Sequence, residues 1–232
     1  MTQPCYQSLR AVRIRASKIN SSTGAPTVGA SNGVVSSAQI QAQIGITITT
    51  GDTGTQKNGD GVTCATFTDP DTLKNVTIAL DLCSADPILR GILTSGTIFT
   101  DPAHASIAAG FQSLAVGSSP TPVCFELWTR AWDGSSQTSS TTTFGNGVAA
   151  YWHWVFPWTT WVEDQTTLSN GIHTLPLKGT GVANSAITAN GPFNDWPTYV
   201  AQNGGVTQPY GYFLDSQLPS ATCGFTAVPA GS

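Results

Sequence analysis

Two pairs of neighbouring carboxylates are the residues of this chain best suited to acid–base chemistry. Asp69 and Asp71 are separated by one residue, and Glu163 and Asp164 are adjacent. Paired carboxylates can hydrolyse a glycosidic bond when burial keeps one of them protonated. Both pairs stand in polar stretches, where acidic side chains are usually solvated. We therefore interpret them as turn residues and predict no catalytic residues.

Other motifs that carry chemistry are missing or incomplete. The sequence contains no Gly-x-Ser-x-Gly, no phosphate-binding loop and no His-Glu-x-x-His. Residues 179–184 begin like a dinucleotide-binding loop but lack its third glycine, and residues 58–61 resemble a calcium loop without its downstream glutamate. We interpret both segments as turns and predict no cofactor.

The cysteines and histidines do not have the spacing of metal ligands. The five cysteines are scattered, odd in number and form no Cys-x-x-Cys, which argues against a zinc site. No apolar run suggests a signal peptide or a membrane span. We therefore expect cytosolic synthesis with free thiols, no bound metal and no membrane insertion. The residues concerned are Cys5, Cys64, Cys83, Cys124 and Cys223, with His104, His153 and His173.

The composition is poor in charge. Only 9% of the 232 residues are charged, and 24 are glycine, whereas charged residues make up about 25% of an ordinary globular protein. Charge normally keeps copies of a protein apart, so this composition is compatible with extensive self-association. It suits an ordinary secreted β-domain equally well.

The charges are also unevenly distributed. Arg10, Arg13, Arg15 and Lys18 all precede the first acid, Asp52, while the remainder of the chain has five bases and 13 acids. We expect this basic N-terminal segment, residues 1–20, to bind an acidic surface of a neighbouring copy. The alternative is a solvated edge strand whose charges discourage aggregation. Nucleic-acid binding is less favoured because no aromatic residues alternate with these bases.

Short β-strands separated by turns account for most of the chain. β-Branched or alternating segments predict strands, and a turn is predicted at residues 31–33. The pattern indicates a single mainly β domain over residues 1–232, a sandwich or barrel. The predicted strands are residues 11–16, 44–50, 62–67, 76–82, 113–116, 123–132, 148–157, 171–177 and 182–188.

One helix is predicted near residues 86–95. Ser84 or Asp86 can cap its start, Pro87 suits the first helical position, and Gly96 suits a left-handed residue at its end. Its apolar face must pack against the strands. That face consists of Ile88, Leu89, Ile92 and Leu93.

Three further segments are expected to be irregular. Residues 51–61 contain four glycines, and residues 134–147 are nearly all Ser, Thr and Gly. Loops of this length are often functional, and contact with a neighbouring molecule could order them. The segment from about residue 204 is interpreted as an extended C-terminal arm because of its prolines at 209, 219 and 229.

The most apolar segment, residues 151–161, carries aromatic residues on both of its faces. A strand covered on both sides, in the core or at a subunit interface, explains this pattern best. Aromatic ladders also stack on sugars, so a carbohydrate-binding β-sandwich, such as a virion adhesin or decoration protein, is the alternative function. The aromatic residues are Tyr151, Trp152, Trp154, Phe156, Trp158 and Trp161.

The order of these segments resembles the major tail tube protein of long-tailed bacteriophages, of the type that infects actinobacteria. The resemblance covers about residues 5–180. It rests on the opening strand at residues 9–15, residues 45–48, the glycine-rich loop ending at 60–64, residues 74–87 before the helix, and the Trp- and Pro-containing strand at 151–157.

This resemblance implies a tail-tube-type β-sandwich or half-barrel whose sheets join six copies into a ring. Stacked rings would form a virion tail tube, assembled in the bacterial cytoplasm, that conducts DNA. The implied partners are the protein itself, a tape-measure protein, and tail terminator and baseplate proteins. Genomic DNA would pass through the lumen without specific binding, and an acidic body suits such a channel.

Overall fold

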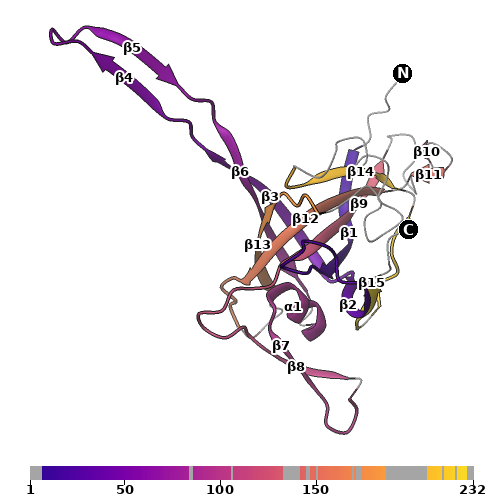
Figure 1. The fold of residues 1–232 in the computed structure, drawn as a ribbon. Coiled ribbons are helices and arrows are strands. Elements are labelled where there is room, and N and C mark those ends of the chain that lie inside the picture. Colours follow the sequence, from indigo (N-terminus) through magenta and orange to yellow (C-terminus); the bar gives the residue numbers. More distant parts are fainter. Residues whose placement is uncertain are drawn as a thin grey trace.

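The protein is mainly β. The computed structural model describes residues 7–83, 86–105, 107–132, 142–144, 147–149, 151–168, 170, 174–186, 208–215, 217–222 and 224–228. These residues form antiparallel strands and one short helix (Figure 1). The predicted fold class, mainly β with a short helix, is therefore confirmed at this level.

Nine of the described strands form one antiparallel sheet. Their order is β15-β2-β1-β9-β12-β13-β6-β3, and β14 also pairs with β12. The strands are β1 (Gln7–Lys18), β2 (Gly29–Ser36), β3 (Gln39–Thr49), β6 (Thr72–Leu82), β9 (Val123–Trp132), β12 (Tyr151–Glu163), β13 (Leu175–Val182), β14 (Gly211–Asp215) and β15 (Thr226–Val228).

Three smaller two-stranded sheets accompany the main sheet within the described residues. They pair β4 (Thr53–Lys57) with β5 (Thr63–Thr68), β7 (Thr97–Thr100) with β8 (Ala108–Gln112), and β10 (Thr142–Phe144) with β11 (Gly147–Ala149).

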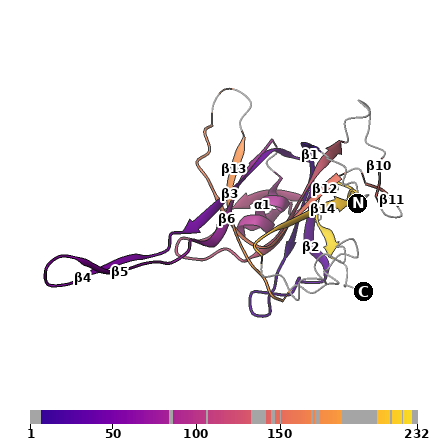
Figure 2. The same cartoon turned by 90° about the horizontal axis from the view of Figure 1, so that it is seen from above.

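The main sheet curves around the helix α1 (Pro87–Thr94), as Figure 2 shows from above. One face of the sheet and the apolar face of α1 form the larger core, with buried residues from α1, β1, β2, β6, β9, β12 and β13. Its largest fully buried side chains include Phe125, Phe156 and Trp161. The predicted packing of the helix on the strands is confirmed.

The start of α1 follows the sequence prediction. Asp86 is the N-cap, and its Oδ1 accepts hydrogen bonds from the backbone N–H groups of Ile88 at 2.9 Å and Leu89 at 3.4 Å. These bonds satisfy donors that the first helical turn leaves unpaired. Ser84, the other predicted cap, lies outside the described residues.

The end of α1 differs from the prediction. Ser95, with φ of 62°, is the left-handed residue, and Gly96 is not. Gly96 serves a different purpose, because a Cβ atom at this position would collide with the Phe111 ring of β8. The glycine therefore permits close packing of β8 and does not terminate the helix.

The basic N-terminal segment 1–20 is neither a free arm nor an edge strand in its described part. β1 lies inside the main sheet, with β2 on one side and β9 on the other. Arg15 is buried against Glu126 of β9 and cannot bind a neighbouring copy. The sequence prediction missed this because it counted charge without locating a buried counter-charge.

Residues 51–61 are not an irregular loop. They form β4 and the turn of a hairpin with β5, which extends away from the body in both views (Figures 1 and 2). Gly54 lies under the Phe67 ring, where a Cβ atom would not fit. We use the name ribbon for residues 46–75, which comprise the end of β3, the β4–β5 hairpin and the start of β6.

The predicted C-terminal arm contributes to the sheet in its described part. β14 pairs with β12, and β15 pairs with β2, where Val228 is buried. Of its prolines, Pro209 precedes β14, Pro219 lies between β14 and β15, and Pro229 lies outside the described residues. Of the predicted loop 134–147, only 142–144 and 147 are described, and they belong to β10 and β11.

Three other sequence predictions were wrong. Residues 113–116 form no strand, and β13 ends at Val182 where a new strand was expected. The turn predicted at residues 31–33 lies inside β2. Gly33 is needed there because a Cβ atom would lie 2.9 Å from the Thr226 carbonyl oxygen of β15.

Candidate functional site

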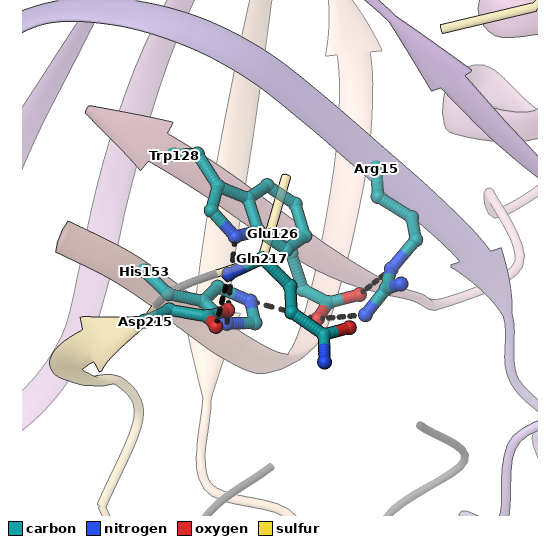
Figure 3. Close-up of polar contacts among 6 residues, drawn as sticks. All are labelled: Arg15, Glu126, Trp128, His153, Asp215 and Gln217. Carbon is teal, nitrogen blue, oxygen red and sulfur yellow. Dashed lines mark hydrogen bonds and ion pairs between the residues drawn. The ribbon is translucent and has the colours of Figure 1, made fainter. Parts of the chain in front are cut away.

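A cluster of buried charged side chains lies on the face of the sheet opposite α1, because its residues alternate along the strands with core residues such as Ile14 and Phe125. Figure 3 shows the cluster in close-up. Each of four strands contributes one group: β1 carries Arg15, β9 carries Glu126, β12 carries His153 and β14 carries Asp215. All four are at most 8% exposed. Such groups remain buried only when they are paired, so their contacts determine what the cluster can do.

Glu126 binds two partners. Arg15 donates two hydrogen bonds to it, from Nε to Oε2 at 2.5 Å and from Nη2 to Oε1 at 2.6 Å. His153 Nε2 lies 2.9 Å from Oε1. The Arg15 pair has the two-pronged geometry that suits guanidinium and carboxylate groups.

Asp215 lies at the other side of the imidazole ring. His153 Nδ1 is 3.2 Å from its Oδ2, a distance suited to an ion pair. Trp128 Nε1 donates to the same oxygen at 3.3 Å, and the backbone N–H of Gln217 donates to Oδ1 at 2.8 Å. Asp215 thereby holds β14 and the start of the following segment against β9 and β12.

Aromatic rings enclose the imidazole. Trp128 stacks on His153 with ring centroids 3.9 Å apart, and Phe213 lies at 4.6 Å. The Arg15 guanidinium sits 5.1 Å above the Trp128 ring, a cation–π contact. These rings remove water from the cluster and strengthen its electrostatic interactions.

The cluster favours ionised carboxylates and a protonated histidine. Burial alone would raise the pKa of Glu126, but Arg15 and His153 outweigh it and lower that pKa to about 2. Burial would lower the pKa of His153, yet its contacts with Asp215 and Glu126 raise it above 6.5. The pKa of Asp215 is lowered, since His153 outweighs the effect of burial. With all four groups ionised, their charges sum to zero.

The chemistry of this arrangement is stabilisation. A Glu–His–Asp series can move protons in an enzyme, but a substrate must reach it. Here Glu126 and His153 are fully buried. The cluster therefore ties β1, β9, β12 and β14 together. Sequence analysis considered His153 only as a metal ligand and did not consider Glu126 or Asp215.

The two predicted acid pairs lie apart from this cluster. Glu163 accepts a hydrogen bond from Arg90 Nε at 2.6 Å, and Asp164 pairs with Lys178 at 2.8 Å. Contact with Lys178 lowers the pKa of Asp164. The two neighbours thus bind different partners. Asp69 and Asp71 are exposed on the ribbon.

The other candidate ligands and motifs do not form a site in the described residues. Cys64 and Cys83 are exposed, and Cys124 is buried, where burial raises the pKa of its thiol. Cys5, Cys223 and His173 lie outside the description, and His104 is exposed. No group of three or more metal-binding side chains is found among the described residues.

The two segments interpreted as turns had different outcomes. At residues 58–61 the turn is confirmed, because Asn58 Oδ1 accepts hydrogen bonds from the backbone N–H groups of Asp60 and Val62. Residues 179–182 instead belong to β13, so the turn interpretation is wrong there. Gly179 is required because a Cβ atom would lie 2.9 Å from the Trp161 ring.

The aromatic strand is largely part of the core. Phe156 is buried in the larger core and its neighbour Val155 in a smaller cluster on the other face, which agrees with a strand covered on both sides. Trp154 stacks on Tyr212 of β14 with ring centroids 4.6 Å apart, and Tyr212 is 51% exposed. Only this end of the aromatic strand thus has an exposed ring stacked on it.

The ribbon is the most prominent exposed apolar feature of the described residues. Five large apolar side chains along it are between 51% and 61% exposed. Ile48 and Leu73 face each other across the β3–β6 pair. β3 forms the end of the main sheet, so its outer edge has no strand partner among the described residues. The five side chains are Ile46, Ile48, Val62, Phe67 and Leu73.

The chain matches no protein-family model, and no curated protein is significantly similar to it. No helix in the described part of the chain has the length and apolar character needed to cross a membrane.

Proposed function

We propose that this protein is a structural subunit that assembles with its own copies, as stacked hexameric rings, into the tail tube of a long-tailed bacteriophage. In this proposal the subunit is not an enzyme and resides in the virion. Genomic DNA passes through the tube during ejection without specific binding. The further partners are a tape-measure protein and tail terminator and baseplate proteins.

The ribbon is the observation that carries the proposal. A two-stranded hairpin without other cover is only marginally stable in water, and a third strand or another packed element is needed to stabilise it. Both β4 and β5 are almost entirely exposed, and the ribbon still presents apolar side chains such as Phe67. Contact with another molecule would supply the missing cover.

The edge of β3 supports a second copy as that molecule. An 11-residue edge strand with exposed isoleucines is a template for pairing with another chain. Proteins usually block such edges with charge, yet β3 has no charged residue. A ring of identical subunits covers edges of this kind, because every copy supplies the same two surfaces.

The proposal is tested by electron microscopy and sedimentation of the purified protein over a range of concentrations. The wild type should form rings or filaments. Ile48→Asp with Leu73→Asp should abolish them, because the pair faces outward on the ribbon. Val116→Asp is the matched control, since Val116 is fully exposed outside the ribbon. A wild type that stays monomeric at every concentration contradicts the proposal.

The alternative function, carbohydrate binding, depends on the exposed Tyr212 ring stacked on Trp154. It has less support, because the other end of the aromatic strand is buried in the core. Retention on a glycan array, lost in Tyr212→Ala without loss of fold, would favour it over the tube.

A further inference from the structure

Three arginines that form no ion pair with a described carboxylate lie where β1 begins and β9 ends. Arg13 of β1 pairs with Trp128 of β9, and Arg130 lies two residues after Trp128 on the same strand. Arg10 lies in the irregular part of β1 opposite Arg130. The Nε atoms of Arg13 and Arg130 are buried without a hydrogen-bond partner in the described part of the chain. We name these three residues the arginine patch.

A matching group of acids lies within the ribbon, where the β4–β5 hairpin begins. Asp52 and Asp69 are joined by a backbone hydrogen bond of 2.9 Å. Asp71 lies beside them, and its Oδ1 accepts a hydrogen bond from the Gly51 N–H at 2.9 Å. All three carboxylates are exposed, and none pairs with a described base. We name Asp52, Asp69 and Asp71 the aspartate patch.

The two patches cannot neutralise each other within one molecule. Both views place the start of β1 on the side of the body away from the ribbon (Figures 1 and 2). Among the described residues, the three arginines and the three aspartates therefore have no ion-pair partner, and they lie on opposite sides of one chain. With only 9% charged residues, these six are a large share of all the charges in the protein.

We propose that the arginine patch of one copy binds the aspartate patch of the next. This inference rests on the proposed self-assembly and specifies one of its contacts. The contact is heterologous, since two different surfaces meet, so it can repeat from copy to copy and build a ring or a stack. Arginine pairs well with carboxylates because its planar guanidinium donates two parallel hydrogen bonds.

Charge reversal tests the contact. Arg10→Glu with Arg13→Glu places like charges against the aspartate patch, and Asp52→Lys with Asp69→Lys does the same from the other side. Each double variant should raise the concentration for half-maximal assembly by at least about tenfold, because like charges in an interface are strongly unfavourable. The aspartates are exposed, so the second variant keeps the test valid if the half-buried Arg13 proves necessary for folding.

Mixing the two variants gives the decisive result. The new glutamates of the arginine variant then meet the new lysines of the aspartate variant. The unchanged arginine patch of the aspartate variant meets the unchanged aspartate patch of the arginine variant. An equal mixture should therefore assemble as the wild type does. Lys18→Glu with Lys178→Glu is the control for the arginine variant, since it also takes the net charge from −4 to −8, two units for each reversal, and both residues lie outside the ribbon and the two patches.

The outcomes separate this inference from the proposed function. If the wild type assembles but both variants do too, or if mixing restores nothing, the patch contact is overturned and self-assembly stands. If the wild type never assembles, the proposed function fails. If a labelled DNA duplex binds the wild type and not the arginine variant, while assembly is unchanged, the arginine patch serves nucleic acid and the contact is again overturned.

Discussion

Removing Arg15 should destabilise the protein, and removing the charge of Glu126 as well should restore much of the loss. Arg15→Met deletes the guanidinium that makes two hydrogen bonds to Glu126 and leaves an unbalanced carboxylate in a fully buried position. The double variant with Glu126→Gln removes that charge. Its amide oxygen can still accept the hydrogen bond from His153.

The magnitude follows from the charge balance of the cluster. The four ionised groups sum to zero in the wild type, to −1 in Arg15→Met and to zero again in the double variant. Breaking a buried ion pair by deleting one partner costs about 3–5 kcal/mol. Because most of this cost is the isolated charge, the double variant should regain about 2 kcal/mol or more relative to Arg15→Met.

The assay is urea unfolding followed by tryptophan fluorescence, with free energies from linear extrapolation. Measurements belong between pH 4.5 and 6.5, the ordinary pKa values of Glu and His, where all four wild-type groups are ionised. A total stability of about 5–15 kcal/mol makes the loss measurable. A double variant less stable than Arg15→Met would refute the charge-balance reasoning.

Two further predictions concern the same fold. The free energy of unfolding should be greatest between about pH 4.5 and 6.5. The pKa of His153 is raised, so its contribution to stability is complete below pH 6.5 and is lost as pH rises through the raised pKa. The pKa of Glu126 is lowered, so its contribution is complete above pH 4.5 and is lost as pH falls towards about 2. Thermal unfolding of the wild type and of His153→Gln at a series of pH values measures this. A wild-type stability that does not vary with pH, or a loss above pH 6.5 that is unchanged in His153→Gln, would contradict the prediction. Asp86→Ala should cost about 1 kcal/mol by removing the cap of α1. Asp86→Asn, which keeps the accepting oxygen, should unfold close to the wild type in the same denaturation experiment, and equal losses in the two variants would argue against capping.

Local signals in the sequence were sufficient for the start and apolar face of the helix and for the strand β9. The residues that begin and form the apolar face of α1 lie within a few positions of one another, so their spacing alone locates it. The strand predicted at residues 123–132 coincides with β9. In each case the deciding interactions are short-range.

The predictions failed where glycine serves packing across strands. Gly33, Gly54 and Gly96 were read as turn or terminator residues, but each allows another segment to approach closely. The approaching atoms belong to β15, Phe67 and β8, and only the folded chain brings them near. Sequence spacing cannot distinguish these two uses of glycine.

The buried cluster could have been suspected but not assembled from the sequence. Glu126 stands between Phe125 and Leu127 in an apolar strand, which is a sign of a buried acid that needs a partner. Finding Arg15 as that partner requires the pairing of β1 with β9, and finding Asp215 requires the pairing of β12 with β14. Neither pairing leaves a local trace.

The strand order also sets when the chain can fold. β1 needs β9 before its buried arginine has a partner, and Arg15 and Glu126 are 111 residues apart. β2 gains its outer neighbour only when β15 has been made. Sheets dominated by such distant pairings fold slowly, typically over milliseconds to seconds. The earliest strands therefore reach their native pairing only after the strands far along the chain have been synthesised.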